Sequence, residues 1–430
     1  MGDARDRLSG RLGFLMLAAG CAVGLGNVWR FPYVVGRNGG AAFVLVYLVF
    51  LALFGFPVLL AELAVGRGGR SGVAGAFRAL GGRRWGRIGL VVFAGNMLLM
   101  AFYTDVAGWL VRFTASYAAG GAPPGFDALV ADKPACLAFM LGAVAAASAA
   151  CALGVRRGVE RITKWMMLSL LALMGLLAAK SLTLPGAAQG LSFYLRPDWG
   201  PLLENPGRVV FEAMGQAFFT LSIGVGAMTI FGSYIERRES LVKESALIIA
   251  IDTAVAFTAG LVIFPACTTY GVDVACGPGL IFAALPKVFE AMDGGRIWGF
   301  AFFLFLSLAA LTTVIAVFEC LVGGIADILK RLNRTAVSAI VGMSVALISL
   351  PCVFVDSALD WEDMVFSKFW LPAGGLSFAL FVSYRFGWGW DAFREEASAG
   401  RGAALPSWMR PVFRYVVPAF ILAVIIGGLI

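Results

Sequence analysis

Long stretches without charged residues are the feature that most constrains what this chain can fold into. The segment from Leu45 to Leu60 contains no charged residue, and a helix needs roughly 20 apolar residues to cross a bilayer. A chain that is 60% hydrophobic and 14% charged cannot present a conventional polar surface to water. We therefore predict one all-α polytopic membrane protein with about 11 transmembrane helices, at residues 12–36, 41–66, 87–118, 134–154, 162–180, 206–236, 243–270, 295–330, 335–355, 364–388 and 409–430.

A transmembrane β-barrel is the alternative architecture. Barrel strands alternate between apolar and polar residues over about 10 positions, whereas the stretches here are continuously apolar. The first stretch carries Asn27 and Arg30 and lacks a small-residue cleavage site, so we expect no signal peptide. Helices therefore fit the pattern better than strands.

The positive charge of the chain lies on alternate loops. The formal net charge is +8, and cytoplasmic loops of inner-membrane proteins carry an excess of Lys and Arg. This asymmetry predicts a cytoplasmic N-terminus, an external C-terminus after 11 spans, and an inner (plasma) membrane location, and it explains the charge without a nucleic-acid partner. The residues concerned are Arg5, Arg7, Arg11, Arg67, Arg70, Arg78, Arg83, Arg84, Arg156, Arg157, Arg161, Lys164, Arg237, Arg238, Lys243, Lys330, Arg331, Arg334, Arg394 and Arg401.

The chain contains no histidine and seven scattered cysteines. The lack of imidazole excludes a histidine proton relay and a histidine-ligated metal site. The cysteines lack CxxC spacing, and small buried hydrophobic residues are their simplest interpretation. Cys267 and Cys276 flank a predicted outer loop and could form a disulfide.

Two of the predicted spans contain helix-breaking segments. Three glycines fall between Gly20 and Asn27, and Phe219 to Gly226 has the sequence FTLSIGVG. Irregular backbone at bilayer depth persists only where it lines a cavity or is buried in protein, although small residues also serve close helix packing. Because the two breaks lie five spans apart, we predict a single transporter domain of two inverted repeats, at about 12–180 and 206–388, with an extra helix at about 409–430.

The segments GLGNVWRFP, from Gly24 to Pro32, and NGGAAF, from Asn38 to Phe43, resemble the neurotransmitter:sodium symporter family in its bacterial amino-acid branch. The similarity extends through residues 57–67, 102–109, 182–199, 216–234, 309–313 and 360–375. The resemblance implies a transporter rather than an enzyme. It would import a neutral hydrophobic L-amino acid, aromatic ones included, with sodium by alternating access. A related indole or amine is the alternative substrate.

The resemblance also implies two sodium sites. The first would use the carbonyl of Ala22 with Asn27, Thr220, Asp252 and the substrate carboxylate. The second would use the carbonyls of Gly20, Val23 and Ala309 with the hydroxyls of Thr312 and Thr313. A Thr pair in an apolar helix also commonly bonds its own backbone.

The implied substrate site has three parts. The substrate carboxylate would meet the amides of Leu25 and Gly26 and the Tyr103 hydroxyl. The substrate side chain would be hydrophobic, because an unpaired buried charge is costly. The ammonium would meet Ala22, Phe219, Thr220 and Ser222. The side-chain subsite would be lined by Leu99, Tyr103, Phe219, Val225, Thr313 and Val317.

Gates and supporting carboxylates complete the expectations. Arg30 and Asp363 match the family's outer gate pair, and Arg5 and Asp327 match the inner pair, with Tyr234 as its brace. Glu62 and Glu319 match positions behind the sixth helix, where two nearby carboxylates would share a proton. The alternative is that each accepts hydrogen bonds from loose backbone near Gly224.

Several positions depart from the family pattern. Leu8 replaces a tryptophan at the inner gate, Cys21 replaces an asparagine, and Asp105 has no counterpart. The usual twelfth span is absent from the sequence, which we expect to leave spans 1–10 intact. Asp252 stands where chloride-dependent relatives have asparagine, and Ala256 where they have serine. A fixed carboxylate predicts transport without a chloride requirement.

Two other functional classes remain as alternatives. An ion channel needs a continuous polar pore, whereas the polar residues cluster at the two breaks. A membrane-embedded enzyme needs a nucleophile with a base, or a metal motif, and the sequence shows neither. Single-channel currents or product formation would favour these alternatives.

Overall fold

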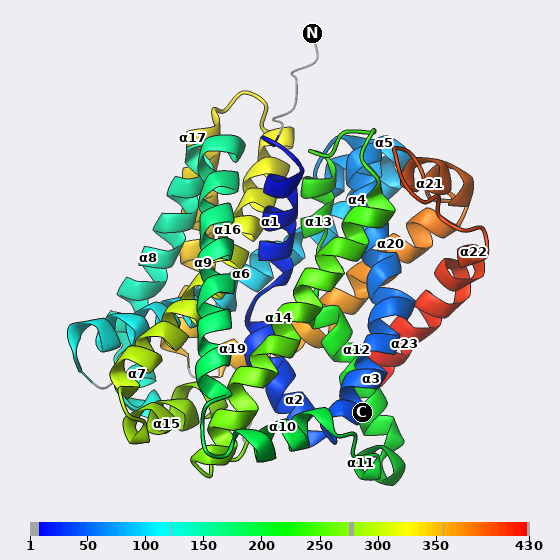
Figure 1. Cartoon of the computed structure of the whole chain (residues 1–430). Coiled ribbons are helices and arrows are strands. Elements are labelled where there is room, and N and C mark those ends of the chain that lie inside the picture. Colours follow the sequence, from blue (N-terminus) through cyan, green and yellow to red (C-terminus); the bar gives the residue numbers. More distant parts are fainter. Residues whose placement is uncertain (1–7, 122, 275–278, 356, 428–430) are drawn as a thin grey trace.

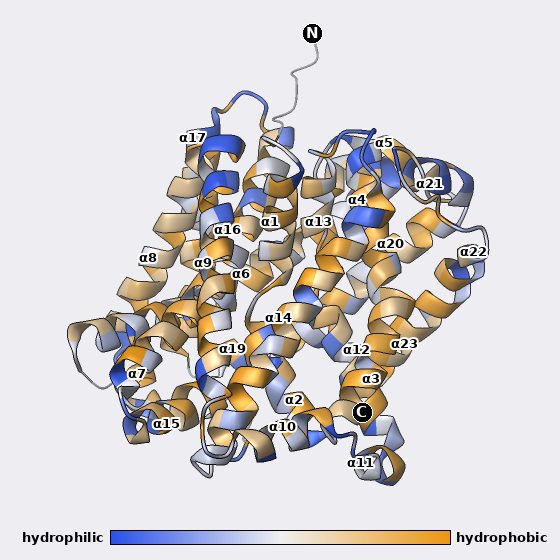
Figure 2. Ribbon diagram, in the orientation of Figure 1, coloured by the Kyte–Doolittle hydropathy of each residue, from blue (hydrophilic) through white to orange (hydrophobic). Residues whose placement is uncertain are grey.

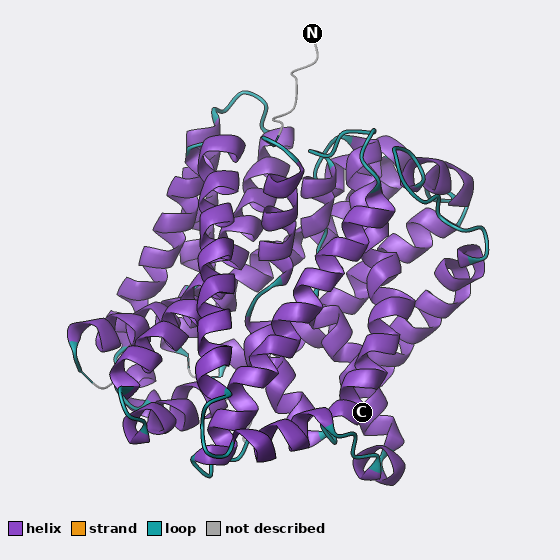
Figure 3. Cartoon of the chain, viewed as in Figure 1, coloured by secondary structure: helices purple, strands orange, loops and turns teal. Residues whose placement is uncertain are grey.

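The computed structural model describes residues 8–121, 123–274, 279–355 and 357–427. Within these residues the chain forms helices and connecting loops (Figure 3), and the only β-type pairing described is an isolated antiparallel bridge between Gly40 and Pro197. The predicted all-helical architecture is confirmed.

The spanning elements of the first half are α1 (Arg11–Ala22) with η1 (Gly26–Arg30) and α2 (Phe31–Arg37), α3 (Ala41–Phe50) with η2 (Leu51–Gly55) and α4 (Phe56–Gly69), α6 (Arg83–Ala119), α8 (Lys133–Ala152), and η3 (Val155–Glu160) with α9 (Arg161–Ser181). The labels η1 to η6 denote π-helical turns, in which the backbone is locally wider than in an α-helix.

The spanning elements of the second half are α12 (Pro206–Thr220) with α13 (Ala227–Gly232), α14 (Leu241–Thr269), α16 (Gly295–Ile328), α17 (Arg334–Ile348) with α18 (Leu350–Phe354), α19 (Ala358–Val365) with η5 (Phe366–Trp370) and α20 (Leu371–Ser383), and α22 (Met409–Pro411) with η6 (Val412–Val416) and α23 (Val417–Gly427). Shorter helices connect them: α5 (Val73–Gly81), α7 (Phe126–Ala131), α10 (Ala187–Leu195), α11 (Gly200–Glu204), η4 (Leu280–Ala284), α15 (Leu285–Ala291) and α21 (Trp390–Ala397).

The number of candidate spans, nine or ten among the described residues, is close to the predicted eleven. Nine helices of the described residues are long and apolar enough to cross a bilayer, and the pair Arg11–Ala22 and Gly26–Arg37, bent by 55°, makes a tenth. The remaining predicted span, at 206–236, is divided into α12 and α13 by six residues, 221–226. Both spans that contain the predicted breaks are therefore broken.

Several predicted boundaries were wrong by more than a turn: the fifth span, predicted at 162–180, runs from Val155 to Ser181, and the tenth, predicted at 364–388, runs from Ala358 to Ser383. The tenth span was expected to begin at residue 364, but the helix begins with α19 at Ala358. Its first two turns carry Asp360, Glu362 and Asp363, which lower the hydropathy of this segment. Hydropathy locates the hydrocarbon-crossing part of a helix and misses a charged extension beyond it.

Hydrophobic residues dominate the middle of the molecule, and hydrophilic residues gather toward its two ends (Figure 2). The helix α1 begins near one of these ends and α23 ends near the opposite one (Figure 1). This arrangement is the one expected for the eleven predicted spans.

Glycines bring two helices into backbone contact with the broken sixth span. A Cβ atom on Gly374 of α20 would lie 1.6 Å from the carbonyl oxygen of Gly224, and one on Gly66 of α4 would lie 1.8 Å from that of Thr229. Small residues permit such close approach between membrane helices. The scaffold thus contacts the sixth span through closely packed backbone.

Candidate functional site

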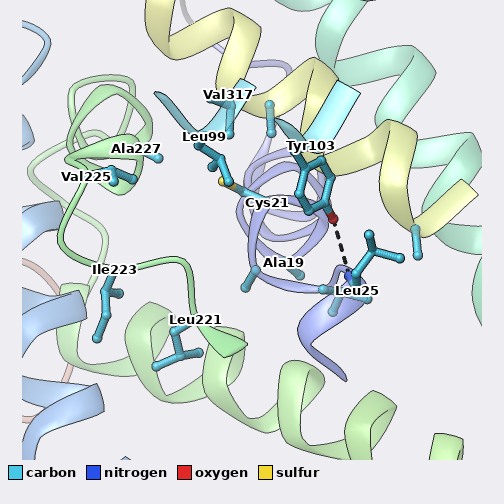
Figure 4. Packing of buried hydrophobic residues seen from close by; sticks show 14 of the residues in the cluster. Ala19, Cys21, Leu25, Leu99, Tyr103, Leu221, Ile223, Val225, Ala227 and Val317 are labelled. Carbon is cyan, nitrogen blue, oxygen red and sulfur yellow. Dashed lines mark hydrogen bonds between the residues drawn. The ribbon is translucent and has the colours of Figure 1, made fainter. Parts of the chain in front are cut away.

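The break in the first span lies between α1 and η1, at Val23 to Leu25. Val23 has an extended backbone conformation that ends α1. The amide of Gly24 donates to Oδ1 of Asn27 at 3.1 Å, and the amide of Leu25 donates to the Tyr103 hydroxyl at 3.2 Å (Figure 4). A Cβ atom on Gly24 would lie 2.7 Å from the Tyr103 hydroxyl oxygen and 2.9 Å from Oγ1 of Thr313, so glycine is needed for this close approach.

The break in the sixth span contains three residues with positive φ. These are Ser222 at 49°, Gly224 at 100° and Gly226 at 73°. A left-handed conformation is unfavourable for a residue with a side chain by roughly 1–2 kcal/mol, so Ser222 is held there by its surroundings. The amide of Ser222 donates to the carbonyl of Phe219 at 3.2 Å.

Buried side chains satisfy backbone groups that this second break releases. Glu62 accepts from the amide of Gly224 at 2.5 Å and from that of Met228 at 3.2 Å. Asn96 of α6 donates from its side-chain nitrogen to the carbonyl of Val225 at 2.8 Å. Unsatisfied backbone groups cost several kcal/mol in a bilayer, so Glu62 and Asn96 support the break. The sequence interpretation missed Asn96, although a buried polar residue in a long apolar span is a signal for such a role.

Polar groups from three spans converge between the two breaks. The side-chain nitrogen of Asn27 donates to Oδ1 of Asp252 at 2.8 Å and lies 3.1 Å from Oγ1 of Thr220. The Thr220 hydroxyl donates to Oδ2 of Asp252 at 3.0 Å. All three side chains have no exposed surface, and the hydrogen-bond partners of the carboxylate are neutral. Such a group favours a small cation bound by oxygen ligands.

A second group of oxygens lies where α1 meets α16. Oγ1 of Thr313 lies 3.3 Å from each of the carbonyl oxygens of Gly20, Val23 and Ala309. The hydroxyl of Thr312 donates to the carbonyl of Ala309 at 2.9 Å. Thus all five predicted ligands of the second sodium are together, and the Thr hydroxyls also make the local backbone bonds that the alternative interpretation expected.

Apolar side chains surround this polar centre. Leu99, Tyr103, Val225 and Val317 are buried, with at most 5% of each exposed, and Figure 4 draws them around the end of α1 and the second break. Phe219 is half-buried, and a Cβ atom on Gly26 would lie 2.8 Å from its ring. Ala22, also buried, ends α1 beside them. The predicted substrate residues therefore form one neighbourhood.

Comparison with known proteins identifies this arrangement. A sequence profile of the Sodium:neurotransmitter symporter family matches residues 5–120 and 132–430. The chain belongs to this family. The symporter is 33% identical to an uncharacterized sodium-dependent transporter of Bacillus subtilis (YhdH), covering 97% of this chain and 96% of the relative.

Two further relatives place the symporter among transporters. The crystal structure of MhsT in complex with L-phenylalanine matches with a TM-score of 0.86 and 35% identity, covering 99% of this chain and 100% of that one. The sodium-dependent serotonin transporter of Drosophila melanogaster is 26% identical over 96% of this chain and 74% of its own length. The symporter is thus a sodium-dependent membrane transporter of a small molecule, and the predicted family is confirmed.

The outer gate pair of the symporter is not formed in this conformation. The Arg30 guanidinium lies over the ring of Phe219, 4.8 Å from its centroid, while Oδ1 of Asp363 accepts from Ser367 at 2.8 Å. Among the described residues no ion pair within 4.0 Å joins Arg30 to Asp363. Arg30 contacts Phe219 and Asp363 contacts Ser367, so the gate pair stays a prediction for another state of the transport cycle.

Only part of the inner gate can be described. Arg5 lies outside the described residues. Asp327 accepts from the Ser71 hydroxyl at 2.6 Å and from the amide of Gly72 at 2.9 Å. The Tyr234 hydroxyl donates to Oε1 of Glu319 at 2.7 Å. Leu8, in place of the family's tryptophan, is partly buried against the core.

Glu62 and Glu319 have distinct partners. Glu62 accepts from backbone amides of the broken helix, as the alternative interpretation expected. Glu319 accepts from the guanidinium of Arg334 at the start of α17. From the sequence, a proton shared with Glu62 was expected to offset the charge of Glu319. The structure adds a second means, the positive charge of Arg334. No sequence signal indicates this pairing, because Arg334 belongs to a basic cluster that flanks a loop.

Two other sequence observations fall outside this site. Both carboxylate oxygens of Asp105 are buried and have no hydrogen-bond partner among the described residues. Cys276 lies outside the described residues, so its pairing with Cys267 stays a prediction.

Proposed function

We propose that the symporter imports a neutral hydrophobic L-amino acid together with two sodium ions. The observation that carries this proposal is the group of Asn27, Thr220 and Asp252, next to the interrupted backbone of both breaks and to an apolar enclosure. A broken helix offers amides to a carboxylate and carbonyls to a cation. An amino-acid zwitterion with sodium complements both.

The substrate carboxylate is proposed to bind near the Leu25 amide and the Tyr103 hydroxyl, which already contact each other at 3.2 Å. The ammonium would face the carbonyls and hydroxyls at Ala22, Phe219, Thr220 and Ser222. The subsite of Leu99, Val225 and Val317 is apolar, which disfavours a charged substrate side chain. The L-phenylalanine bound to MhsT in the 35% identical structure supports a substrate of this class.

The two sodium ions have different proposed tasks. The first, at Ala22, Asn27, Thr220 and Asp252, would neutralise the buried carboxylate and the substrate carboxylate together. The second would join α1 to α16, since Thr313 of α16 contacts the carbonyls of Gly20 and Val23 in α1. Loss of that second ion would release α1 from α16 and favour opening toward the cytoplasm. Alternating access would thereby follow sodium release.

The membrane arrangement is also part of the proposal. The basic loops support an inner-membrane protein with a cytoplasmic N-terminus, and the two broken spans support inverted repeats at about 12–180 and 206–388 within one domain, 1–430. The gate residues Arg30, Asp363, Arg5, Asp327 and Tyr234 would close the two mouths in turn. Chloride is not required, because Asp252 supplies a permanent negative charge.

A thermal-shift screen tests this function directly. Purified symporter would be mixed with each of the twenty amino acids and with indole and amine compounds, in sodium and in matched potassium buffer. Ligand binding raises the unfolding temperature according to the ratio of concentration to Kd. Stabilisation by hydrophobic amino acids in sodium alone is expected. Stabilisation by amines or indoles but by no amino acid would replace the proposed substrate class.

A further inference from the structure

A basic hollow lies at the start of the fifth span. It has a volume of about 570 Å³ and is lined by Ser9, Arg156, Arg157, Glu160, Arg161, Lys164 and Trp165. We call it the η3 hollow, after the turn that supplies three of these residues, Arg156, Arg157 and Glu160. None of the lining residues is among the substrate and sodium residues described above.

The four cations of the η3 hollow are available to a ligand. Arg156, Arg157 and Arg161 are exposed and Lys164 is partly exposed. None of the four makes a hydrogen bond or ion pair with another residue in the described part of the chain. Other arginines on the same side do have carboxylate partners: Arg67 pairs with Glu396 at 2.6 Å, and Arg237 with Glu395 at 3.2 Å.

The single carboxylate in the η3 hollow is already occupied. Glu160 is 2% exposed and accepts from the amide of Ser9 at 2.8 Å and also from the Ser9 hydroxyl. It therefore forms part of the floor, where it fastens the start of α1, and leaves an excess of three positive charges around the opening. Such a cluster favours a phosphate or another compact anion.

The surroundings indicate that this anion is carried by a lipid. Trp165 is 62% exposed and lies one turn beyond Arg161, and Leu168 and Leu176 farther along α9 are 39% and 52% exposed. Only 33% of the most apolar part of this span, Val155–Ser181, is buried within the protein. Exposed tryptophan is typical of the membrane interface, so a phosphate in the hollow would lie directly above an apolar surface for acyl chains.

We propose that the η3 hollow binds the headgroup of an anionic phospholipid of the cytoplasmic leaflet. The three arginines would contact the phosphodiester, Lys164 would add charge, and the acyl chains would lie along Trp165 and Leu168. Basic pockets beside membrane helices on the cytoplasmic side suit such headgroups. This inference rests on the proposed orientation of the chain. It is independent of which substrate is carried.

The η3 hollow also adjoins a contact of the transport core. A Cβ atom on Gly13 of α1 would lie 1.8 Å from the Glu160 carboxylate, so α1 and η3 approach closely at the bonded Ser9. A lipid in the hollow would lie against the residues that hold the start of α1. A lipid bound in the η3 hollow is thus positioned to influence α1, the half of the first span that precedes the break.

Lipid titration of the purified symporter in neutral detergent tests the proposal. Dioleoyl phosphatidylglycerol, dioleoyl phosphatidylcholine, glycerol 3-phosphate and inorganic phosphate would each be added while the unfolding temperature is recorded. Stabilisation by phosphatidylglycerol alone is expected. Equal stabilisation by glycerol 3-phosphate or phosphate would mean a soluble-anion site, and equal stabilisation by phosphatidylcholine would mean no headgroup selection; either result overturns the proposal.

Charge-matched variants identify the site. The triple variant Arg156→Gln, Arg157→Gln, Arg161→Gln is expected to bind phosphatidylglycerol about a hundredfold more weakly, because each basic residue near an anionic lipid surface contributes a factor of about five. The control variant Arg83→Gln, Arg84→Gln, Arg87→Gln removes the same charge from the exposed first turns of α6 and should bind as the wild type does. If both triple variants bind phosphatidylglycerol equally weakly, the lipid is attracted by the overall positive charge of the protein and not by a specific site in the η3 hollow.

A second readout serves if the triple variant does not fold. Phosphatidylglycerol with brominated acyl chains quenches nearby tryptophan, and the difference between wild type and Trp165→Phe isolates the signal of Trp165. Saturable quenching of this signal by brominated phosphatidylglycerol, at concentrations where brominated phosphatidylcholine gives little, is expected. Identical quenching curves for the two lipids would contradict the proposal. Because this test needs no substrate, failure of the proposed amino-acid transport would not affect it.

Discussion

The side-chain nitrogen of Asn27 lies 2.8 Å from the carboxylate Oδ1 of Asp252 and 3.1 Å from its backbone oxygen, although 225 positions separate the two residues in sequence. The contact joins the break of the first span to the middle of α14. It leaves Oδ1 of Asn27 to accept the amide of Gly24 at 3.1 Å. One amide therefore fixes both the broken backbone and the buried carboxylate.

Replacing Asn27 with alanine is expected to weaken sodium-dependent substrate binding about tenfold or more, since hydrogen bonds to a charged group contribute about 1.5–3 kcal/mol. The measurement is the sodium concentration that gives half-maximal thermal stabilisation at fixed substrate. Asn38→Ala is the control. The Asn38 side chain is also buried, but it donates a hydrogen bond to Glu212 at 2.5 Å and lies outside this site. Equal sodium affinity in Asn27→Ala and wild type would exclude the assignment.

The second sodium site predicts a different defect. Thr313→Val keeps the shape of the side chain and removes a hydroxyl that lies 3.3 Å from three carbonyl oxygens. We expect the sodium dependence of binding to become weaker and less steep, because one of two ions is lost. Thr104→Val is the matched control, since Thr104 is also buried and bonds the carbonyl of Met100 at 2.8 Å. If substrate binding by Thr313→Val depends on sodium as steeply as binding by the wild type does, this result would count against a second ion at this site.

How much of this could be predicted from sequence differs from element to element. The first span, predicted at 12–36, is described as Arg11 to Arg37 with a bend of 55°, because glycine spacing and hydropathy are local signals. Asn96 and Arg334 were not assigned partners, since their contacts depend on how α6, α13, α16 and α17 pack together. The left-handed Ser222 also lacked a local signal, as glycine is the usual residue for that conformation.

The size of the substrate side-chain subsite is tested at Val225. This residue has no exposed surface, so Val225→Phe adds volume where little space is free. We expect competition by large amino acids to weaken relative to that by alanine. Val345→Phe in α17 is the control, because Val345 is equally buried but lies outside the site. The same competition profile in wild type and Val225→Phe would remove Val225 from the subsite.

The pair formed by Arg334 and Glu319 is expected to matter for stability. The Glu319 side chain is fully buried and that of Arg334 is 23% exposed. Removing one partner of a buried pair costs about 3–5 kcal/mol, so Arg334→Gln should lower the unfolding temperature clearly. Arg237→Gln breaks an exposed pair with Glu395 and a longer contact of 3.4 Å with Glu396, which keeps its buried partner Arg67, so this variant should have a much smaller effect. Adding Glu319→Gln to Arg334→Gln should restore part of the loss, and no restoration would show that the carboxylate is uncharged without its arginine.

The last prediction concerns chloride. Bringing a substrate and two sodium ions into a cavity of low dielectric constant leaves positive charge that an anion must offset. Asp252 has no exposed surface, and its carboxylate accepts only from the neutral groups of Asn27 and Thr220 in the described structure. Ala256, one turn later in α14, is also buried and has no hydroxyl that could donate to chloride. We therefore expect the fixed carboxylate of Asp252 to take the place of a bound anion.

Substrate uptake into proteoliposomes, with chloride replaced by gluconate, provides the test. Wild-type uptake should not change when chloride is removed. The double variant Asp252→Asn with Ala256→Ser loses the carboxylate and gains a hydroxyl, so its uptake should be slower and should be stimulated by chloride. The single variant Ala256→Ser keeps the carboxylate and is the control, for which chloride should have no effect. Strong chloride dependence of the wild type would refute the role given to Asp252, because the charge of the carboxylate would then not suffice to balance the bound cations.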